Sequence, residues 1–164
     1  METETIELKK ASAEWIASLH DWTTFNTLTF REPREPDVAW YYYRRLLQVL
    51  NIDAFGKHYI RKVGHCYYPY VVAMEYQKRD VVHFHFLCDR PLHFDLIHGW
   101  WGAAAGFAYI GKIDKFMSTM DYMTKYETKS DSGFLVYENL VDKTPLIKGP
   151  VNCVRPWWWV TPKG

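Results

Sequence analysis

The segment His83-Phe84-His85 places two imidazoles one residue apart, and Glu75 precedes it by eight residues. On a β-strand, side chains two positions apart point to the same face. Two imidazoles and one carboxylate make a three-ligand metal site that leaves coordination positions open. Burying three such polar groups together is costly unless they are paired or bind a metal. The pattern therefore predicts a metal site formed by Glu75, His83 and His85.

A second group of residues could supply a nucleophile. Residues three and four apart are neighbours on a helix surface, so one stripe carries Tyr122, Lys125, Tyr126 and Lys129. A phenol is a weak nucleophile at neutral pH, and a nearby ammonium group favours the phenolate and stabilises charge on a phosphate. Taken alone, the same stripe is equally typical of a solvated helix surface with long lysine side chains.

A β-hairpin is expected to position the proposed metal ligands. Residues 70–77 and 81–88 have the composition of strands and flank a short polar turn. A turn of that length places Glu75 opposite His83, and directly opposed residues share a face. Phe84 and its alternate neighbours then pack on the other face, so the hairpin gathers the three ligands on one side of a sheet.

The other periodic segments alternate between helices and strands. We expect helices over residues 5–20, 37–50, 93–106 and 114–129, and further strands over residues 25–30, 107–113 and 134–137. In the first of these strands, Thr27 and Thr29 share one face. The order predicts a single α+β domain over residues 1–164.

Composition excludes several classes of protein. The chain has 164 residues, of which 48% are hydrophobic, so intrinsic disorder is not expected. No run approaches the roughly 20 apolar residues of a membrane span, and the polar start is unlike a signal peptide. The three cysteines are widely spaced and fit neither a disulfide framework nor a paired zinc motif. We expect an intracellular protein with no membrane partner.

The charge distribution is compatible with nucleic acid as a partner. Residues 1–40 hold eight acidic and four basic residues, whereas residues 41–164 hold eleven acidic and sixteen basic ones. Such an excess of positive charge suits a surface that faces phosphates. Lys57, Arg61 and Lys62 are candidates for contacts to a DNA backbone. An exposed, solvated loop explains these three residues equally well.

Three motifs, in order over residues 25–129, resemble those of the HUH endonucleases. His83-Phe84-His85 resembles their His-hydrophobic-His motif, and Phe25-Asn-Thr-Leu-Thr-Phe30 resembles their first motif. Tyr122-x-x-Lys125 and Tyr126-x-x-Lys129 each resemble their tyrosine motif. Glu75 sits where replication initiators of circular single-stranded DNA viruses carry their acidic metal ligand.

The resemblance implies a fold and a metal site. HUH nucleases have a five-stranded antiparallel sheet with flanking helices, with the His-x-His strand at its centre and the tyrosine helix alongside. By this resemblance Glu75, His83 and His85 hold a divalent ion, Mg²⁺ or Mn²⁺, that polarises a scissile phosphate. Thr27 and Thr29 belong to the scaffold or to a strand that contacts DNA.

The resemblance also implies a covalent reaction on single-stranded DNA or an origin hairpin. Tyr122 or Tyr126 attacks the phosphate, and Lys125 or Lys129 assists. The products are a 5′-phosphotyrosine and a free 3′-OH that primes rolling-circle replication. Either one tyrosine acts, as in single-tyrosine viral initiators, or both alternate, as in phage-type initiators.

Several alternatives stay open. A transposase or conjugative relaxase of the same superfamily shares the chemistry. A two-histidine, one-carboxylate metal oxygenase needs no tyrosine stripe, and a non-catalytic nucleic-acid-binding module would need aromatic residues on the sheet face. The chain lacks a Gly-rich nucleotide-binding loop, so a helicase would be a host protein or a fused domain. The expected compartment is the cytoplasm of a prokaryotic host, or the nucleus for a eukaryotic virus.

Overall fold

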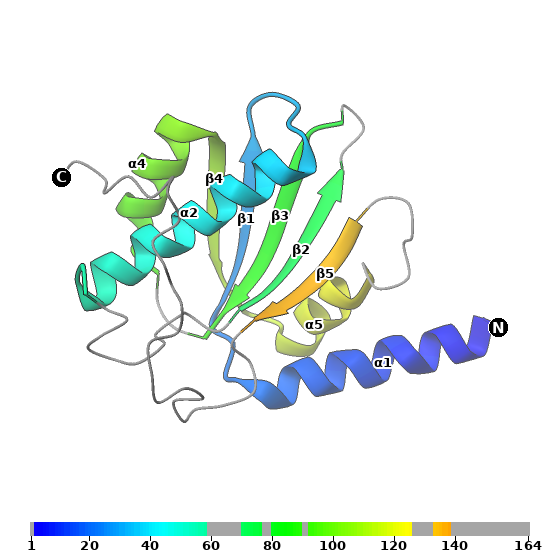
Figure 1. Ribbon diagram of the computed structural model, residues 1–164. Coiled ribbons are helices and arrows are strands. Elements are labelled where there is room, and N and C mark those ends of the chain that lie inside the picture. Colours follow the sequence, from blue (N-terminus) through cyan, green and yellow to red (C-terminus); the bar gives the residue numbers. More distant parts are fainter. Residues whose placement is uncertain (1, 59–69, 77–79, 90–91, 126–132, 139–164) are drawn as a thin grey trace.

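The computed structural model describes residues 2–58, 70–76, 80–89, 92–125 and 133–138 (Figure 1). In chain order the elements are α1 (Glu2–Leu19), β1 (Thr24–Phe30), α2 (Pro36–Phe55), β2 (Tyr70–Tyr76), β3 (Val82–Cys88), α4 (Phe94–Ala104), β4 (Gly106–Lys112), α5 (Phe116–Thr124) and β5 (Gly133–Glu138). The expected alternation of helices and strands is confirmed. The helix expected over residues 114–129 begins at Phe116, and its last part lies outside the described ranges.

The five strands form one sheet in the order β4-β1-β3-β2-β5, and every neighbouring pair is antiparallel. The expected α+β fold with a five-stranded antiparallel sheet and flanking helices is confirmed. The strand that carries the two histidines, β3, is the central one. None of the helices in the described ranges is long and apolar enough to cross a membrane.

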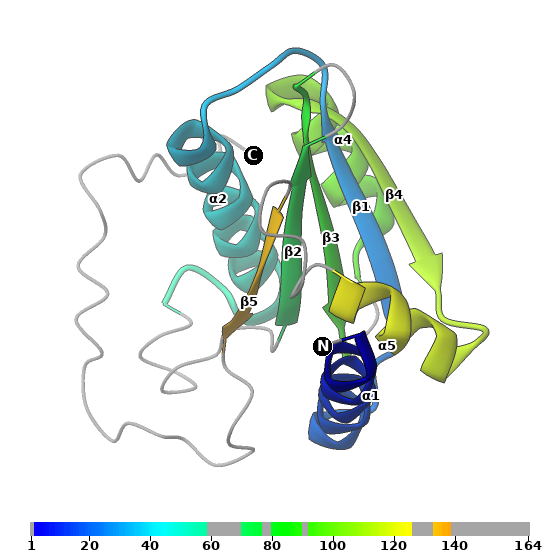
Figure 2. The ribbon, with the colours of Figure 1, turned by 90° about the vertical axis from the view of Figure 1, so that its right-hand side faces the viewer.

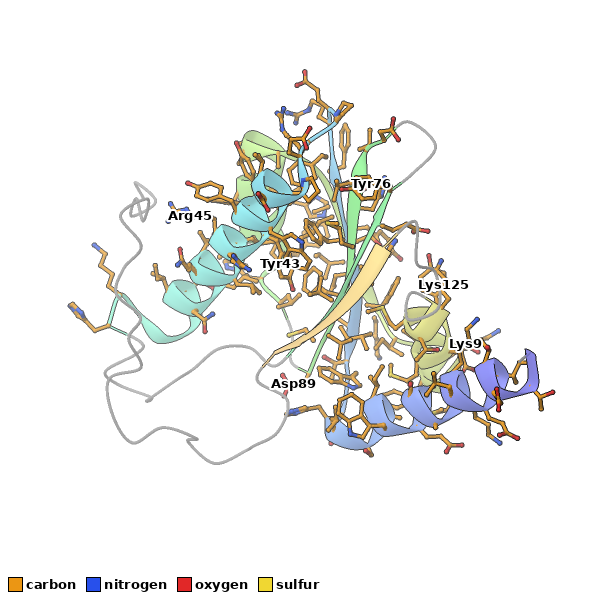
Figure 3. The ribbon with its side chains drawn as sticks, turned by 45° about the vertical axis from the view of Figure 1, so that its right-hand side comes forward. Lys9, Tyr43, Arg45, Tyr76, Asp89 and Lys125 are labelled. Carbon is orange, nitrogen blue, oxygen red and sulfur yellow. The ribbon has the colours of Figure 1, made fainter. Side chains whose placement is uncertain are left out.

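Helices cover both faces of the sheet (Figure 2). On one face, α2 and α4 pack against the even-numbered residues of β1 and β3, which include Leu28, Phe84 and Phe86. Tyr43 of α2 is fully buried in this cluster and points from the helix toward the sheet (Figure 3). On the other face, α1 and α5 bury a smaller apolar cluster against Leu87 and its strand neighbours.

The hairpin register agrees with the expectation from the turn length. In the β2–β3 ladder Glu75 lies opposite His83, and Ala73 lies opposite His85. All seven residues of β3 are buried, although a strand buried on both faces is ordinarily an apolar run. The second face of β3 therefore carries two imidazoles at positions where burial favours aliphatic side chains.

Gly106 lets β4 approach β1 closely at the end of α4. A Cβ at this position would collide with the carbonyl oxygen of Thr29 and would stand 2.8 Å from the backbone nitrogen of Arg31. We expect Gly106→Ala to lower the free energy of unfolding by about 1–3 kcal/mol, because backbone atoms cannot move aside cheaply. Urea denaturation measures the change.

Gly102 provides the matched control for that substitution. It lies within α4, and nothing is within 4 Å of an added Cβ there. Gly102→Ala should stabilise the protein by up to about 1 kcal/mol, because alanine favours the helix. Equal effects of the two substitutions would contradict the close approach inferred for Gly106.

Candidate active site

Two rows of side chains cross the sheet on the face that carries the histidines. The ladder partners in the first row are Tyr109, Thr27, His85 and Ala73, and those in the second row are Phe107, Thr29, His83 and Glu75. The adjacent row, with Phe25, Leu87 and Val71, is apolar and packs against α1 and α5. The face is therefore divided into an apolar end under two helices and a polar end that contains both histidines.

A threonine hydroxyl from β1 holds each imidazole. Thr27 Oγ1 is 3.0 Å from His85 Nδ1, and Thr29 Oγ1 is 3.0 Å from His83 Nδ1. A hydroxyl can donate or accept, so these bonds are compatible with either tautomer of the ring. In both residues the bond fixes the ring plane and leaves Nε2 to face the rest of the site.

The two Nε2 atoms have different surroundings. His85 Nε2 is 3.4 Å from Glu75 Oε2, a long contact across the diagonal of the ladder. His83 Nε2 is buried and has no hydrogen-bond partner. A buried nitrogen without a partner costs about 1–3 kcal/mol, which a ligand at this position would relieve.

Both histidines are held in the neutral form at neutral pH. Burial lowers the pKa of His85 to about 4, although Glu75 partly opposes the shift. Burial also lowers the pKa of His83, again against the influence of Glu75. A neutral imidazole is the form that ligates a metal, so proton competition at these two nitrogens is weak.

The donor set fits a divalent metal. It offers two neutral imidazole nitrogens, one without a partner, and the carboxylate of Glu75 beside the other. As these side chains stand, no group of three His, Cys, Asp or Glu residues within the described ranges is already arranged to hold a metal ion. The metal site of Glu75, His83 and His85 stays a prediction that small side-chain rotations would have to complete.

Tyr122 of α5 lies against this site. Its ring makes an edge-to-face contact with His85, with centroids 5.7 Å apart, and a second one with Phe25 at 5.6 Å. Phe25 in turn stacks on His85 at 5.7 Å. The Tyr122 side chain is 39% exposed, so it can be reached from solvent while it contacts a buried ligand candidate.

Lys125 lies one helical turn beyond Tyr122, on the outer side of α5 (Figure 3). Its Nζ is 3.6 Å from the centre of the Tyr122 ring, so the ammonium group contacts the face of the ring. The α5 residues on the opposite stripe, Met120 and Met123, are fully buried, as their spacing predicts. The described part of the tyrosine stripe thus faces the site with a phenol and a cation.

The remaining candidate residues are not brought to this face. Arg61, Lys62, Tyr126 and Lys129 lie outside the described residues. Lys57 is exposed just beyond the C-terminal end of α2, a helix that covers the opposite face of the sheet.

Sequence reasoning missed the role of the two threonines as histidine partners. The available signal was two threonines with the same two-residue spacing as the histidines. It also missed Phe107 and Tyr109, which extend both rows on β4. The alternation of these aromatic residues with smaller apolar ones was the signal for the second pair.

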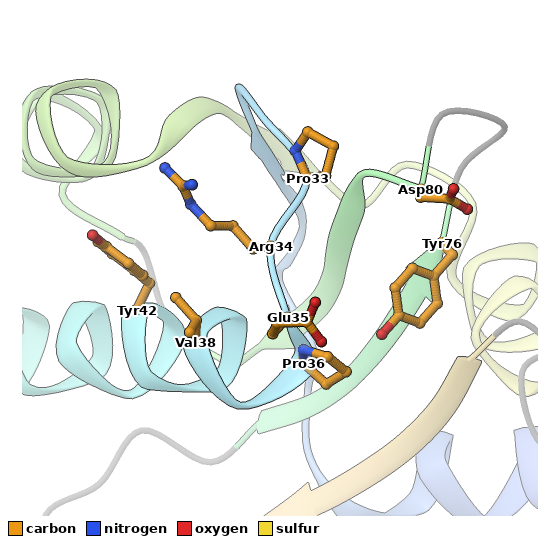
Figure 4. A pocket seen from close by; sticks show the side chains of 8 residues that line it. All are labelled: Pro33, Arg34, Glu35, Pro36, Val38, Tyr42, Tyr76 and Asp80. Atoms are coloured by element: carbon orange, nitrogen blue, oxygen red, sulfur yellow. The ribbon is translucent and has the colours of Figure 1, made fainter.

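A pocket of about 650 Å³ lies at one end of the sheet, between the β1–α2 connection and the β2–β3 turn (Figure 4). Tyr76 lines it and, as the neighbour of Glu75, points to the other face of the sheet. Burial and the nearby carboxylates of Glu35 and Asp80 raise the pKa of Tyr76. The carboxylates disfavour a phosphate here, so the pocket is not an extension of the candidate active site.

The hydroxyl of Thr27 should contribute to metal affinity. We expect Thr27→Val to weaken Mn²⁺ binding about 10–100-fold, since the hydroxyl orients His85 and supports its tautomer. Thr27→Ser keeps the hydroxyl and should bind the ion within a few-fold of the unmodified protein. Titration calorimetry measures both. An unchanged dissociation constant in Thr27→Val would show that the bond does not position the ligand.

Comparison with known proteins gives one match. The sequence profile of a family described as replication-associated protein ORF2 matches residues 23–131. Searches of curated proteins and of solved structures found no significant match. The matched region runs from β1 through α5, covers more than half of the chain and contains every described residue of the candidate active site. The chain therefore belongs to this replication-associated protein family, whose members are replication initiator-type proteins.

Proposed function

We propose that this protein is an HUH-type endonuclease that nicks single-stranded DNA and transfers the strand to a tyrosine, and so initiates rolling-circle replication. The observation that carries the proposal is the edge contact between the Tyr122 ring and His85. It puts a solvent-accessible phenol beside a buried imidazole whose neighbours form a plausible metal-ligand set. A structural histidine would need neither the accessible phenol nor the adjacent carboxylate of Glu75.

The proposed reaction is a phosphodiester exchange. The Tyr122 oxygen forms a bond to the scissile phosphorus as the bond from phosphorus to the 3′ oxygen breaks. The phenol loses its proton and the departing 3′ oxygen gains one, which leaves a 5′-phosphotyrosine and a free 3′-OH. One phosphodiester replaces another, so the step is reversible and needs no external energy source.

The chain's own residues would position the reactants. Glu75, His83 and His85 would hold Mg²⁺ or Mn²⁺, and Thr27 and Thr29 would orient the two imidazoles. A divalent ion in this place supplies Lewis-acid stabilisation of the charge on the scissile phosphate.

The ammonium group of Lys125 is the described positive charge nearest to the Tyr122 ring for which a contact is measured. Because it lies over the ring face and not at the phenol oxygen, we assign it to the phosphate that approaches Tyr122. There it would stabilise the charge that develops as the phosphorus is attacked. Tyr126 and Lys129, beyond the described part of α5, are proposed as the second tyrosine and lysine of the same stripe.

Family membership favours replication initiation over the transposase and relaxase variants of the same chemistry. It also separates the protein from the metal oxygenases that use two histidines and one carboxylate. A non-catalytic DNA-binding module is the competing function, because the family match by itself does not require catalysis.

Covalent capture tests the proposal. The protein is incubated with Mn²⁺ or Mg²⁺ and a labelled pool of randomised single-stranded oligonucleotides, and adducts are resolved on a denaturing protein gel. A labelled band that depends on the metal is expected, and sequencing of its DNA reports the preferred site. DNA binding without any adduct or cleavage under either metal would establish the non-catalytic module instead.

A further inference from the structure

Two aromatic side chains on the edge strand β4 continue the rows of the candidate active site. Phe107 is the ladder partner of Thr29, and Tyr109 is the ladder partner of Thr27. Directly paired residues share a face, so both rings point to the side of the sheet that carries the histidines. Each ring is 64% exposed, although the alternate residues of the strand pack into the core on the other face.

Both rings are held in place by their surroundings. The Arg31 guanidinium lies over the Phe107 ring, 5.7 Å from its centre, and also donates a 2.7 Å hydrogen bond to the carbonyl of Gly102. The Tyr109 ring lies over Gly111, where an added Cβ would be 2.8 Å from the ring. Gly111 therefore leaves room for the ring to lie along the strand.

From these observations we infer that Phe107 and Tyr109 form a stacking platform for unpaired bases of the single-stranded DNA whose phosphate reaches the histidines. This inference rests on the proposed function. Adjacent strands are about 4.8 Å apart, so two strands separate the rings from the histidines by about 10 Å. A stacked strand advances about 3.4 Å per nucleotide, so the bases concerned lie within about three nucleotides of the scissile phosphate.

Charge and shape both select single-stranded DNA as the occupant. Aromatic faces stack on unpaired bases of any sequence, and an arginine beside them can contact the backbone phosphates. Arg31 keeps further N–H donors beyond the one used for Gly102. The platform is also continuous with the candidate active site, since Thr27 and Thr29 are the residues between the rings and the histidines.

The test compares the unmodified chain with a variant that carries Phe107→Ala and Tyr109→Ala. The probe is a fluorescein-labelled oligothymidine of about 20 nucleotides, with an abasic strand of the same length for comparison, both in EDTA so that no cleavage intervenes. We expect the variant to bind oligothymidine at least about tenfold more weakly, because each stacked base contributes about 1–3 kcal/mol. The abasic strand should bind both proteins equally.

Control variants separate stacking from folding. Phe94 is an exposed phenylalanine on α4, on the other face of the sheet, so Phe94→Ala should not change the affinity for oligothymidine. The conservative pair Phe107→Tyr and Tyr109→Phe should bind within about threefold of the unmodified chain, since both rings are kept. Thermal unfolding followed by circular dichroism checks that each variant is folded.

Two results would overturn the inference. One is an oligothymidine affinity that the double alanine variant leaves unchanged. The other is a change from dimer to monomer in sedimentation with no effect on DNA, which would assign this face to a second copy of the chain through the exposed edge of β4. Failure of the unmodified protein to form an adduct, with the stacking difference intact, would reject the proposed nickase alone.

Discussion

Tyr122→Phe is expected to abolish the covalent protein–DNA adduct, with a fall of at least about 1,000-fold in the rate of nicking. The substitution removes only the phenol oxygen, which is the atom that the proposal assigns to the attack on phosphorus. The edge contact of the ring with His85 and its contact with the Lys125 ammonium do not require the hydroxyl. The affinity for single-stranded DNA and the stability of the fold should therefore stay unchanged. Adduct formation on a denaturing gel, together with binding by fluorescence anisotropy, measures the separation.

Tyr41→Phe is the matched control, because Tyr41 lies on α2, on the other side of the sheet from the histidines. It should form the adduct at the rate of the unmodified protein. Tyr126→Phe and the double variant decide between one nucleophile and two. If each single variant keeps an adduct and the double variant loses it, either tyrosine can act. An adduct retained in Tyr122→Phe and lost in Tyr126→Phe would contradict the assignment of Tyr122.

The hairpin could be predicted because its geometry is local. The polar turn between the two strands sets the register, and with the register fixed Glu75 must face His83. The alternation of Phe84 with the two histidines then assigns each side chain to a face. The same reasoning worked for α5, where a period of 3.6 residues separates the buried Met120 from the stripe that carries Tyr122.

The partners of the histidines could not be predicted, because they depend on which strands become neighbours. Nothing in the spacing of residues 24–30 says that β1 lies between β3 and β4. That order turns Thr27 and Thr29 from scaffold residues into hydrogen-bond partners of imidazoles. It also brings two aromatic residues of β4 into the same rows. Such pairings are long-range in sequence and follow from packing of the whole sheet.

The imidazole of His83 should cost stability when no metal is present. Its Nε2 is buried without a partner, and its Nδ1 is bonded to Thr29. We expect the paired replacement Thr29→Val with His83→Leu to leave the stability in EDTA unchanged or to raise it by up to about 3 kcal/mol. Replacing both partners of a buried polar contact with apolar groups of similar shape removes an unsatisfied atom without creating another. Urea denaturation in EDTA measures this arm.

The metal should reverse that order of stability. At Mn²⁺ about 100-fold above its dissociation constant, the unmodified protein should gain about 2.7 kcal/mol, and the paired variant should lose most of this gain together with adduct formation. Thr29→Val alone is the control: it leaves His83 Nδ1 without its hydroxyl and should destabilise the protein in EDTA. A paired variant that is less stable than the unmodified protein in EDTA would mean that His83 is a structural residue. A histidine that weakens the metal-free fold and stabilises it only with an ion is instead explained by what it binds.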